Sequence, residues 1–157
     1  MALGPVIFKL HLFESPADRQ RSETCILWLC EALTAIDKTW LEAYPQTPAL
    51  YNSPVRYHFD PARPDAWKDV PTILRDGHGD CEDLACWRVA ELRASGIPAR
   101  PYIKWRKGAR GMIYHVVAWH PDGRIEDPSL ALGMRGPSPR HALFIGRDLE
   151  YVRNLTL

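Results

Sequence analysis

The stretch that decides the fold reads Gly77-His78-Gly79-Asp80-Cys81-Glu82-Asp83-Leu84-Ala85. Asp80 is a residue type that caps helices, and Gly96 is a typical stop signal. The sequence between them therefore predicts a helix from Cys81 to about Ser95. Apolar residues occupy most sides of this segment, which is typical of a helix buried in the middle of a fold.

Cys81 opens this predicted helix, and we expect it to be a nucleophile. The first turn of a helix offers free N–H groups and a partial positive charge, and both favour a thiolate. Glu82 and Asp83 oppose the thiolate, but we expect the helix and an ion pair with His115 to prevail and to lower the thiol pKa. Gly79 leaves room for a substrate to approach. The alternative is that Cys81 is simply a small buried residue.

His115 and Asp127 are the predicted partners of this thiol. Strong β-type sequence over 112–119 is followed by the turn His120-Pro121-Asp122-Gly123 and a return strand over 124–127. Closing this hairpin brings Asp127 opposite residue 116 or 117, within reach of His115. Cysteine, histidine and aspartate are the types that a thiol nucleophile, its base and an orienting acid require.

Other interpretations of these residues stay open. His78 is a rival base, three residues before Cys81, and Glu126 is a rival acid on the opposite face of its strand. His115 is alternatively a core histidine, and Asp127 a turn-capping residue before proline.

The rest of the chain contributes a helix and loops. A strand is expected over 6–13, and a helix over 16–40 whose apolar stripe is Cys25, Trp28, Leu29, Leu33 and Ile36. Residues 44–71 carry six prolines and several aromatic residues, so we expect an ordered loop that wraps over the core. Residues 72–79 are interpreted as a turn, 128–141 as a loop, and 142–153 as a closing strand or helix.

Composition excludes several classes of protein. The 157 residues fit one domain, and the net charge of +1 gives no general attraction to nucleic acid or anionic membrane. The longest apolar run, Cys25 to Cys30, is far shorter than the roughly 18 residues of a membrane helix. Neither cysteine pair has zinc-knuckle spacing, and the Gly-His-Gly segment is no phosphate loop, so no metal and no cofactor are expected. Without an export signal, reduced thiols in a cytoplasm are expected.

These motifs resemble the transglutaminase-like cysteine peptidase superfamily, especially its small bacterial and phage members. The resemblance covers roughly residues 66–130. It rests on the block around Cys81, on Gly96-Ile97-Pro98-Ala99-Arg100, on Tyr114-His115-Val116-Val117 and on Ile125-Glu126-Asp127-Pro128.

The resemblance implies an α+β fold with a papain-like core, in which the nucleophile helix packs on an antiparallel sheet. It also implies amide hydrolysis through a thioester, with acyl transfer, or a non-catalytic structural or binding role in a phage particle or other assembly, as alternatives. The substrate would be a peptide, a protein or a peptidoglycan-like amide, and the location cytoplasmic or virion-associated. Papain-like enzymes often place Gln six residues before the nucleophile, where this chain has Arg75. Trp67, His78, Gly79 and Asp80 are therefore the candidates for oxyanion or substrate contacts.

A single transglutaminase-like domain over 1–157 is expected. Within it, residues 1–65 supply a helix and the wrapping segment, residues 66–130 the catalytic core, and residues 131–157 a closing segment.

Overall fold

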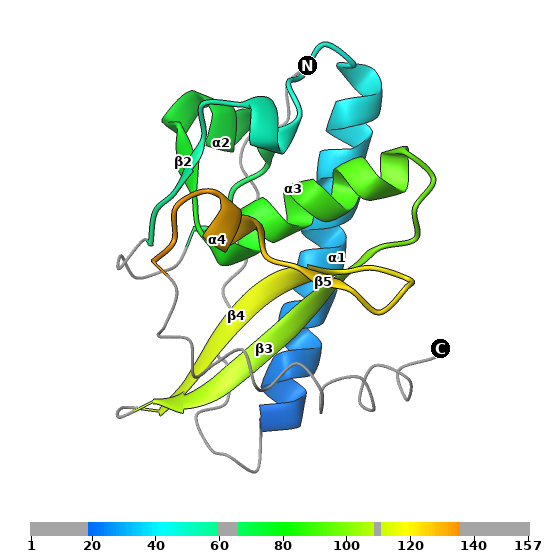
Figure 1. The fold of residues 1–157 in the computed structure, drawn as a ribbon. Coiled ribbons are helices and arrows are strands. Elements are labelled where there is room, and N and C mark those ends of the chain that lie inside the picture. The colour runs from blue at the N-terminus through cyan, green and yellow to red at the C-terminus, as the bar shows by residue number, and fades with distance from the viewer. Residues whose placement is uncertain (1–18, 60–65, 109–110, 136–157) are drawn as a thin grey trace.

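The computed structural model describes residues 19–59, 66–108 and 111–135, which form a mixture of helices and strands (Figure 1). The helices are α1 (Arg19–Ala43), the 3-10 turn η2 (Leu50–Asn52), α2 (Val70–Asp76), α3 (Cys81–Ala94) and α4 (Pro128–Ala131). The strands are β1 (Arg56–Tyr57), β2 (His78–Gly79), β3 (Arg100–Gly108), β4 (Gly111–Trp119) and β5 (Ile125–Glu126). Strands β1 and β2 pair in parallel, and β3, β4 and β5 form an antiparallel sheet in that order.

Helix α3 is the central element, as its apolar sequence predicts. It crosses α1 and contacts the antiparallel sheet, while α4 lies near its N-terminal end (Figure 1). Asp80 is its N-cap, and Gly96, in the left-handed conformation at φ 83°, follows its end. The predicted boundaries are therefore confirmed to within one residue.

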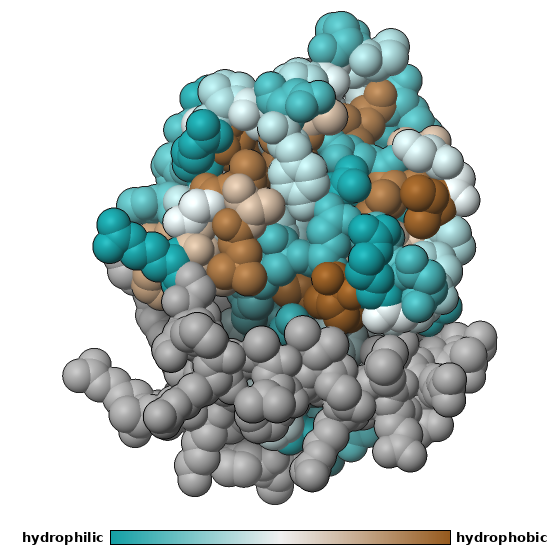
Figure 2. All heavy atoms as spheres, viewed as in Figure 1, coloured by the Kyte–Doolittle hydropathy of each residue, from teal (hydrophilic) through white to brown (hydrophobic). Residues whose placement is uncertain are grey.

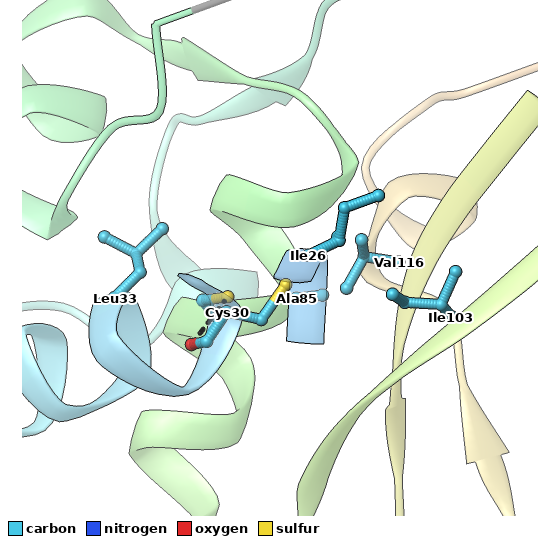
Figure 3. Close-up of a cluster of buried hydrophobic side chains, with 7 residues drawn as sticks. Ile26, Cys30, Leu33, Ala85, Ile103 and Val116 are labelled. Atoms are coloured by element: carbon cyan, nitrogen blue, oxygen red, sulfur yellow. Dashed lines mark hydrogen bonds between the residues drawn. The ribbon is translucent and has the colours of Figure 1, made fainter. Parts of the chain in front are cut away.

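Two large apolar clusters join α3 to its neighbours, besides a smaller one made of Val89, Leu92, Ala99 and Ala118. One brings α1, α3 and the sheet together through Ile26, Cys30, Leu33, Ala85, Cys86, Ile103 and Val116 (Figure 3). The other lies beneath the segment that leads from η2 to β1, and consists of Leu50, Val55, Val70, Ile73, Leu84, Trp87 and Leu132. Because Leu50 and Val55 are fully buried, the described part of the proline-rich segment does cover the core.

The prediction for the buried face of α1 is wrong. Of the expected stripe, Leu33 is buried, whereas Trp28 is 71% exposed and Ile36 is 55% exposed. The helix instead buries a mixed face, made of Ser22, Glu23, Ile26, Cys30, Leu33, Thr34 and Asp37. Apolar periodicity misleads here because buried polar groups of α1, Asp37 among them, bond to other segments.

Two short helices replace predicted loops. A turn is predicted over 72–79, but α2 begins at Val70, and the Asp69 side chain caps it by accepting the N–H of Thr72. Pro71 in the first turn and Gly77 at φ 76° complete the signals of a short helix. Helix α4 occupies the start of the expected loop over 128–141, with Asp127 as its N-cap. The expected elements at 6–13 and 142–153 lie outside the described residues.

The hairpin that ends in β5 forms as its turn sequence predicts. The N–H of His120 donates to the Arg124 carbonyl oxygen at 2.9 Å, and Gly123 adopts a left-handed φ of 86°. Ala118 pairs with Glu126 and Trp119 with Ile125. Continuing this register places Asp127 opposite Val117, one of the two positions predicted.

The surface carries no large uniform patch on the face seen in Figure 2, where hydrophobic atoms alternate with hydrophilic ones over the coloured residues. None of the described helices combines the length and apolar character needed to cross a membrane.

Candidate active site

The Cys81 sulfur lies where the start of α3 meets the middle of β4. The backbone N–H of Val116 donates to this sulfur, and Val116 directly follows His115. The thiol in turn donates to Oε2 of Glu82 at 3.1 Å. The nucleophile candidate is therefore held against the strand that carries the base candidate.

The close approach of β2 to α3 requires glycine before the helix. A Cβ atom built on Gly79 would lie 3.0 Å from the Cβ of Asp83 and 3.2 Å from its Oδ2. A larger residue would therefore require Asp83, two residues after Cys81, to shift. The glycine motif thus has a packing role as well as the expected role of leaving room for a substrate.

His115 and Asp127 are in direct contact. Nε2 of His115 lies 2.8 Å from Oδ2 of Asp127, and both side chains are mostly buried. When Nε2 carries the proton and donates to the carboxylate, Nδ1 is the unprotonated nitrogen. Nδ1 is then the atom available to accept a proton from a thiol.

Asp127 is fixed by two different donors. Besides Nε2 of His115, the backbone N–H of Leu130 donates to its Oδ1 at 3.2 Å, because Asp127 caps α4. Burial alone would raise the pKa of Asp127, but the His115 and Leu130 hydrogen bonds and the charge of Lys104 outweigh burial and lower it. Asp127 is therefore a stable anion beside the imidazole. The two interpretations of Asp127, as a capping residue before proline and as a partner of His115, are therefore compatible, because each uses a different oxygen of its carboxylate.

The expected lowering of the Cys81 pKa is not found. Burial raises the pKa of this thiol, and the charge and hydrogen bond of Glu82 and the charge of Asp80 add to the effect. The Val116 N–H lowers the pKa but is outweighed. The prediction is wrong because it treats Glu82 as a screened surface acid, whereas Glu82 is buried against the sulfur.

The start of α3 is held by Asp83, which is itself buried. Its Oδ2 accepts the backbone N–H of Asp80 at 3.2 Å, and its Oδ1 accepts that of Lys68 at 2.7 Å. Burial and the charge of Asp80 outweigh these hydrogen bonds and the charge of Lys68, and raise the pKa of Asp83 to about 8. Asp83 ties the segment before α2 to the helix that begins with the nucleophile candidate.

Among the described residues, Asp80, Glu82 and Asp83 have carboxylate oxygens within 4.8 Å of one another, the spacing of a metal site. Two of these carboxylates already accept hydrogen bonds inside the site, Glu82 from the thiol and Asp83 from backbone N–H groups. The group is better explained as part of the helix start.

The remaining candidates occupy the edges of the site. Nδ1 of His78 lies 3.3 Å from Nζ of Lys68, and its ring stands edge-on to His58 at 5.0 Å. Trp67 packs against the cluster that also touches Cys81, so it stays a candidate for an oxyanion contact.

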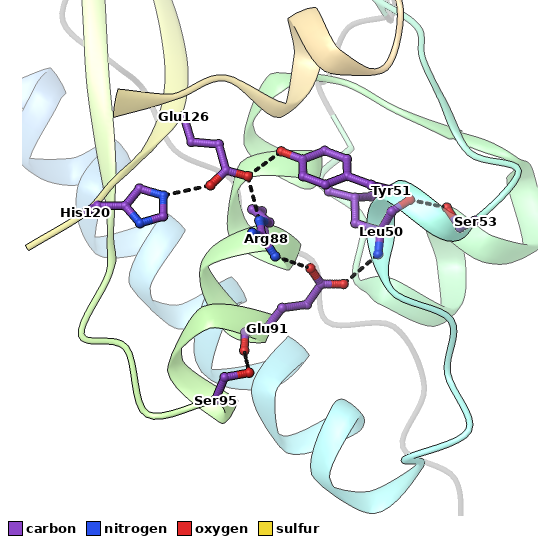
Figure 4. A network of polar contacts seen from close by, with 8 residues as sticks. All are labelled: Leu50, Tyr51, Ser53, Arg88, Glu91, Ser95, His120 and Glu126. Carbon is purple, nitrogen blue, oxygen red and sulfur yellow. Dashed lines mark hydrogen bonds and ion pairs between the residues drawn. The ribbon is translucent and has the colours of Figure 1, made fainter. Parts of the chain in front are cut away.

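Glu126 belongs to a separate polar network (Figure 4). It accepts Nε of Arg88 at 2.6 Å, Nε2 of His120 at 2.7 Å and the Tyr51 hydroxyl at 2.5 Å. The carboxylate in contact with His115 is thus Asp127, in agreement with the strand alternation.

Sequence reasoning missed Tyr57. This residue lies in β1, opposite Gly79 in the β1–β2 register. Burial and the charges of Cys81, Asp80, Glu82 and Asp127 raise the pKa of Tyr57 to about 12. Tyr57 lies in a proline-rich stretch with no local motif, so only tertiary structure could reveal it.

Comparison with protein families gives one match. The model of the transglutaminase-like superfamily matches residues 31–123, more than half of the chain. The match begins well before the stretch over 66–130 in which the motifs occur, so much of α1 and the wrapping segment are included. It ends four residues before Asp127. No significant match was found among curated proteins or solved structures.

Proposed function

Because this chain belongs to the transglutaminase-like superfamily, we propose that it is a cysteine-dependent amide hydrolase with a papain-like core. Cys81 is the nucleophile, His115 the general base and acid, and Asp127 the residue that orients His115. The observation that carries the proposal is the 2.8 Å contact between Nε2 of His115 and Oδ2 of Asp127. It lies beside the nucleophile candidate, because Val116, the residue after His115 in β4, donates its N–H to the Cys81 sulfur.

The reaction follows from this arrangement. Nδ1 of His115 takes the thiol proton while the sulfur attacks the amide carbon, giving a tetrahedral oxyanion. The C–N bond then breaks, the amine leaves with the proton from His115, and a thioester remains. Water, deprotonated by the same nitrogen, attacks the thioester and releases the acid and the thiol.

The raised pKa of Cys81 determines how the thiol is activated. A buried thiol that donates to Glu82 is largely uncharged at rest. Proton transfer to His115 therefore accompanies attack on the substrate rather than preceding it. Any substrate group that displaces the Glu82 contact favours this transfer.

The test uses the Cys25→Ser protein, because Cys25 is an exposed thiol that would react independently of the site. Hydrolysis of p-nitrophenyl acetate, peptides and peptidoglycan fragments is measured, and Cys81 acylation is followed by mass spectrometry. Cys81→Ala is expected to abolish acylation and turnover, and His115→Ala to reduce both by roughly 10²-fold or more. Lys38→Ala, at an exposed position of α1, is the control variant and should retain activity. Turnover that survives in Cys81→Ala would contradict the proposal.

Acyl transfer to an amine uses the same thioester and differs in what attacks it. No described feature favours an amine over water. Assembly into a phage particle, with a cytoplasmic or virion-associated location, stays a prediction. Release of free acid in the presence of a labelled amine, without incorporation of the label, would identify the protein as a hydrolase.

A further inference from the structure

Tyr57 lies between the segment that leads to the nucleophile and the segment that follows the acid. The N–H of His58 donates to the Gly79 carbonyl oxygen at 2.9 Å, which holds β1 beside the approach to Cys81. The N–H of Tyr57 itself donates to the carbonyl oxygen of Leu132 at 3.0 Å, just beyond α4. Backbone hydrogen bonds on both sides thus fix the position of Tyr57.

The two parts of the Tyr57 side chain have different surroundings. The partly buried ring packs against the apolar cluster beneath the wrapping segment. The hydroxyl is within electrostatic range of the Cys81 sulfur and of the carboxylates of Asp80, Glu82 and Asp127, which, after burial, are the causes that raise its pKa to about 12. The hydroxyl therefore stays protonated, and remains a hydrogen-bond donor, throughout the neutral pH range.

The proposed reaction requires donors near the sulfur. When Cys81 attacks an amide, the carbonyl oxygen becomes an anion that needs preorganised hydrogen bonds. The backbone N–H at the start of α3 is one such donor. The Val116 N–H is directed at the sulfur itself, so a second donor must come from another element.

We propose that the Tyr57 hydroxyl is the second donor, and that it donates a hydrogen bond to the oxyanion formed from the substrate carbonyl. This inference rests on the proposed function. The role would bring the Tyr57 hydroxyl into direct contact with the reacting oxygen. The reason is that β1 pairs Tyr57 with Gly79, two residues before Cys81, and that the hydroxyl is an uncharged donor. Trp67, which packs against the same apolar cluster as Cys81, is the competing candidate.

The experiment compares two reactions of Cys81 in the Cys25→Ser protein. Acylation by p-nitrophenyl acetate passes through an oxyanion, whereas alkylation by iodoacetamide displaces iodide without forming one. Tyr57→Phe keeps the ring and removes the donor. It is expected to slow acylation by roughly 10²-fold, the usual effect of losing one oxyanion donor, and to leave alkylation unchanged.

The controls separate this inference from the proposed function. Tyr44→Phe, at an exposed tyrosine that stacks on Trp40, should change neither rate. Unchanged alkylation also shows that Tyr57→Phe retains a folded site. Acylation that is unaffected by Tyr57→Phe, or slowed by Trp67→Phe alone, would overturn the role of Tyr57 while leaving the hydrolase proposal intact. Equal slowing of both reactions would overturn it too, because Tyr57 would then act on the thiol. A parent protein whose Cys81 is not acylated at all would contradict the proposed function itself.

Discussion

Buried acidic side chains lie beside both halves of α3, but their hydrogen-bond donors differ between the two halves. Around its first turns, Asp37 and Asp83 accept backbone N–H groups, and the pKa of each rises to about 8. Farther along the helix, Arg88 donates to both Glu91 and Glu126 (Figure 4).

This difference is reflected in the protonation of the two regions. Burial would raise the pKa of Glu126, but hydrogen bonds from Tyr51, Arg88 and His120 lower it, so Glu126 is an anion in a paired network. Asp37 and Asp83, whose donors are backbone N–H groups, hold their protons more tightly. One half of the helix therefore has fixed charges, whereas the other has protons that can be gained or lost close to the nucleophile candidate.

Asp127 directly follows Glu126 and contacts His115, and replacing it should have the largest effect on activity. Asp127→Asn removes the anion that holds the His115 imidazole, and turnover should fall by roughly 10²-fold or more. The acid-side limit of the pH–rate profile should move down, because His115 must be neutral to accept the thiol proton and its protonated form loses the support of the carboxylate. The measurement is the pH dependence of kcat/KM.

Its matched control is Glu126→Gln, one residue away. This change should lower the melting temperature, because Arg88 loses an ion pair, and reduce activity much less. Full activity and an unchanged pH profile in Asp127→Asn would exclude Asp127 as the orienting residue.

Arg88→Met should have the largest effect on stability in the paired region. It leaves Glu91 and Glu126 mostly buried without their shared cation, at a cost of about 2–3 kcal/mol in the free energy of unfolding. Urea unfolding measures this cost. Arg75→Met, at an arginine whose side chain is 71% exposed, is the control and should change stability little. A similar small effect from Arg88→Met would mean that the network contributes no net stability.

Glu82→Gln tests the opposite region, where a negative charge suppresses the thiolate. Removing that charge should lower the pKa of Cys81 and speed its alkylation by iodoacetamide at neutral pH, by about tenfold for each unit that the pKa falls. The rate is measured against pH in the Cys25→Ser protein. Glu42→Gln, at the exposed end of α1, should leave the rate unchanged. A slower Glu82→Gln reaction would mean that Glu82 assists the thiol instead.

The elements that the sequence predicts are those whose signals are local. Helix α3 and the β4–β5 hairpin follow from local signals, because Asp80, Gly96 and Gly123 are caps and turn residues whose effects act over a few positions. The contact of His115 with Asp127 then follows from the register of a short hairpin.

What sequence reasoning missed depends on distant partners. Asp37 looks like a solvated helix residue until the N–H of Val70, 33 positions away, is brought to it. Tyr57 joins the site through pairing of β1 with β2, across the proline-rich segment. Glu82 opposes the thiol because tertiary packing excludes the water that would screen its charge. Helix α2 differs from these cases, because its cap Asp69 and its Pro71 are local signals that are sufficient to predict it.

Asp37→Asn should change how stability depends on pH. The pKa of Asp37 rises from 3.8 to about 8, because burial outweighs the hydrogen bond from Val70 and the charges of Asp69 and Asp83 add to it. Between these values the folded protein binds more protons than the unfolded chain, so the free energy of unfolding falls as pH rises. One such group contributes a slope of at most about 1.4 kcal/mol per pH unit.

The asparagine introduced by Asp37→Asn is uncharged at every pH and keeps an oxygen for the Val70 N–H. The substitution should therefore flatten this slope, and the gain over the parent should reach its full size from about pH 8 upward. Urea unfolding at a series of pH values gives the slope directly. The pKa of Asp83 is also raised to about 8, and Asp83 is still present in this variant. The dependence of the free energy of unfolding on pH should therefore become weaker without disappearing. Asp122→Asn, at an exposed turn residue, should leave the slope as it is. An undiminished slope in Asp37→Asn would mean that Asp37 is already ionised in the folded protein, and that Asp37 and Asp83 do not form a pair of acids that hold their protons beside this half of α3.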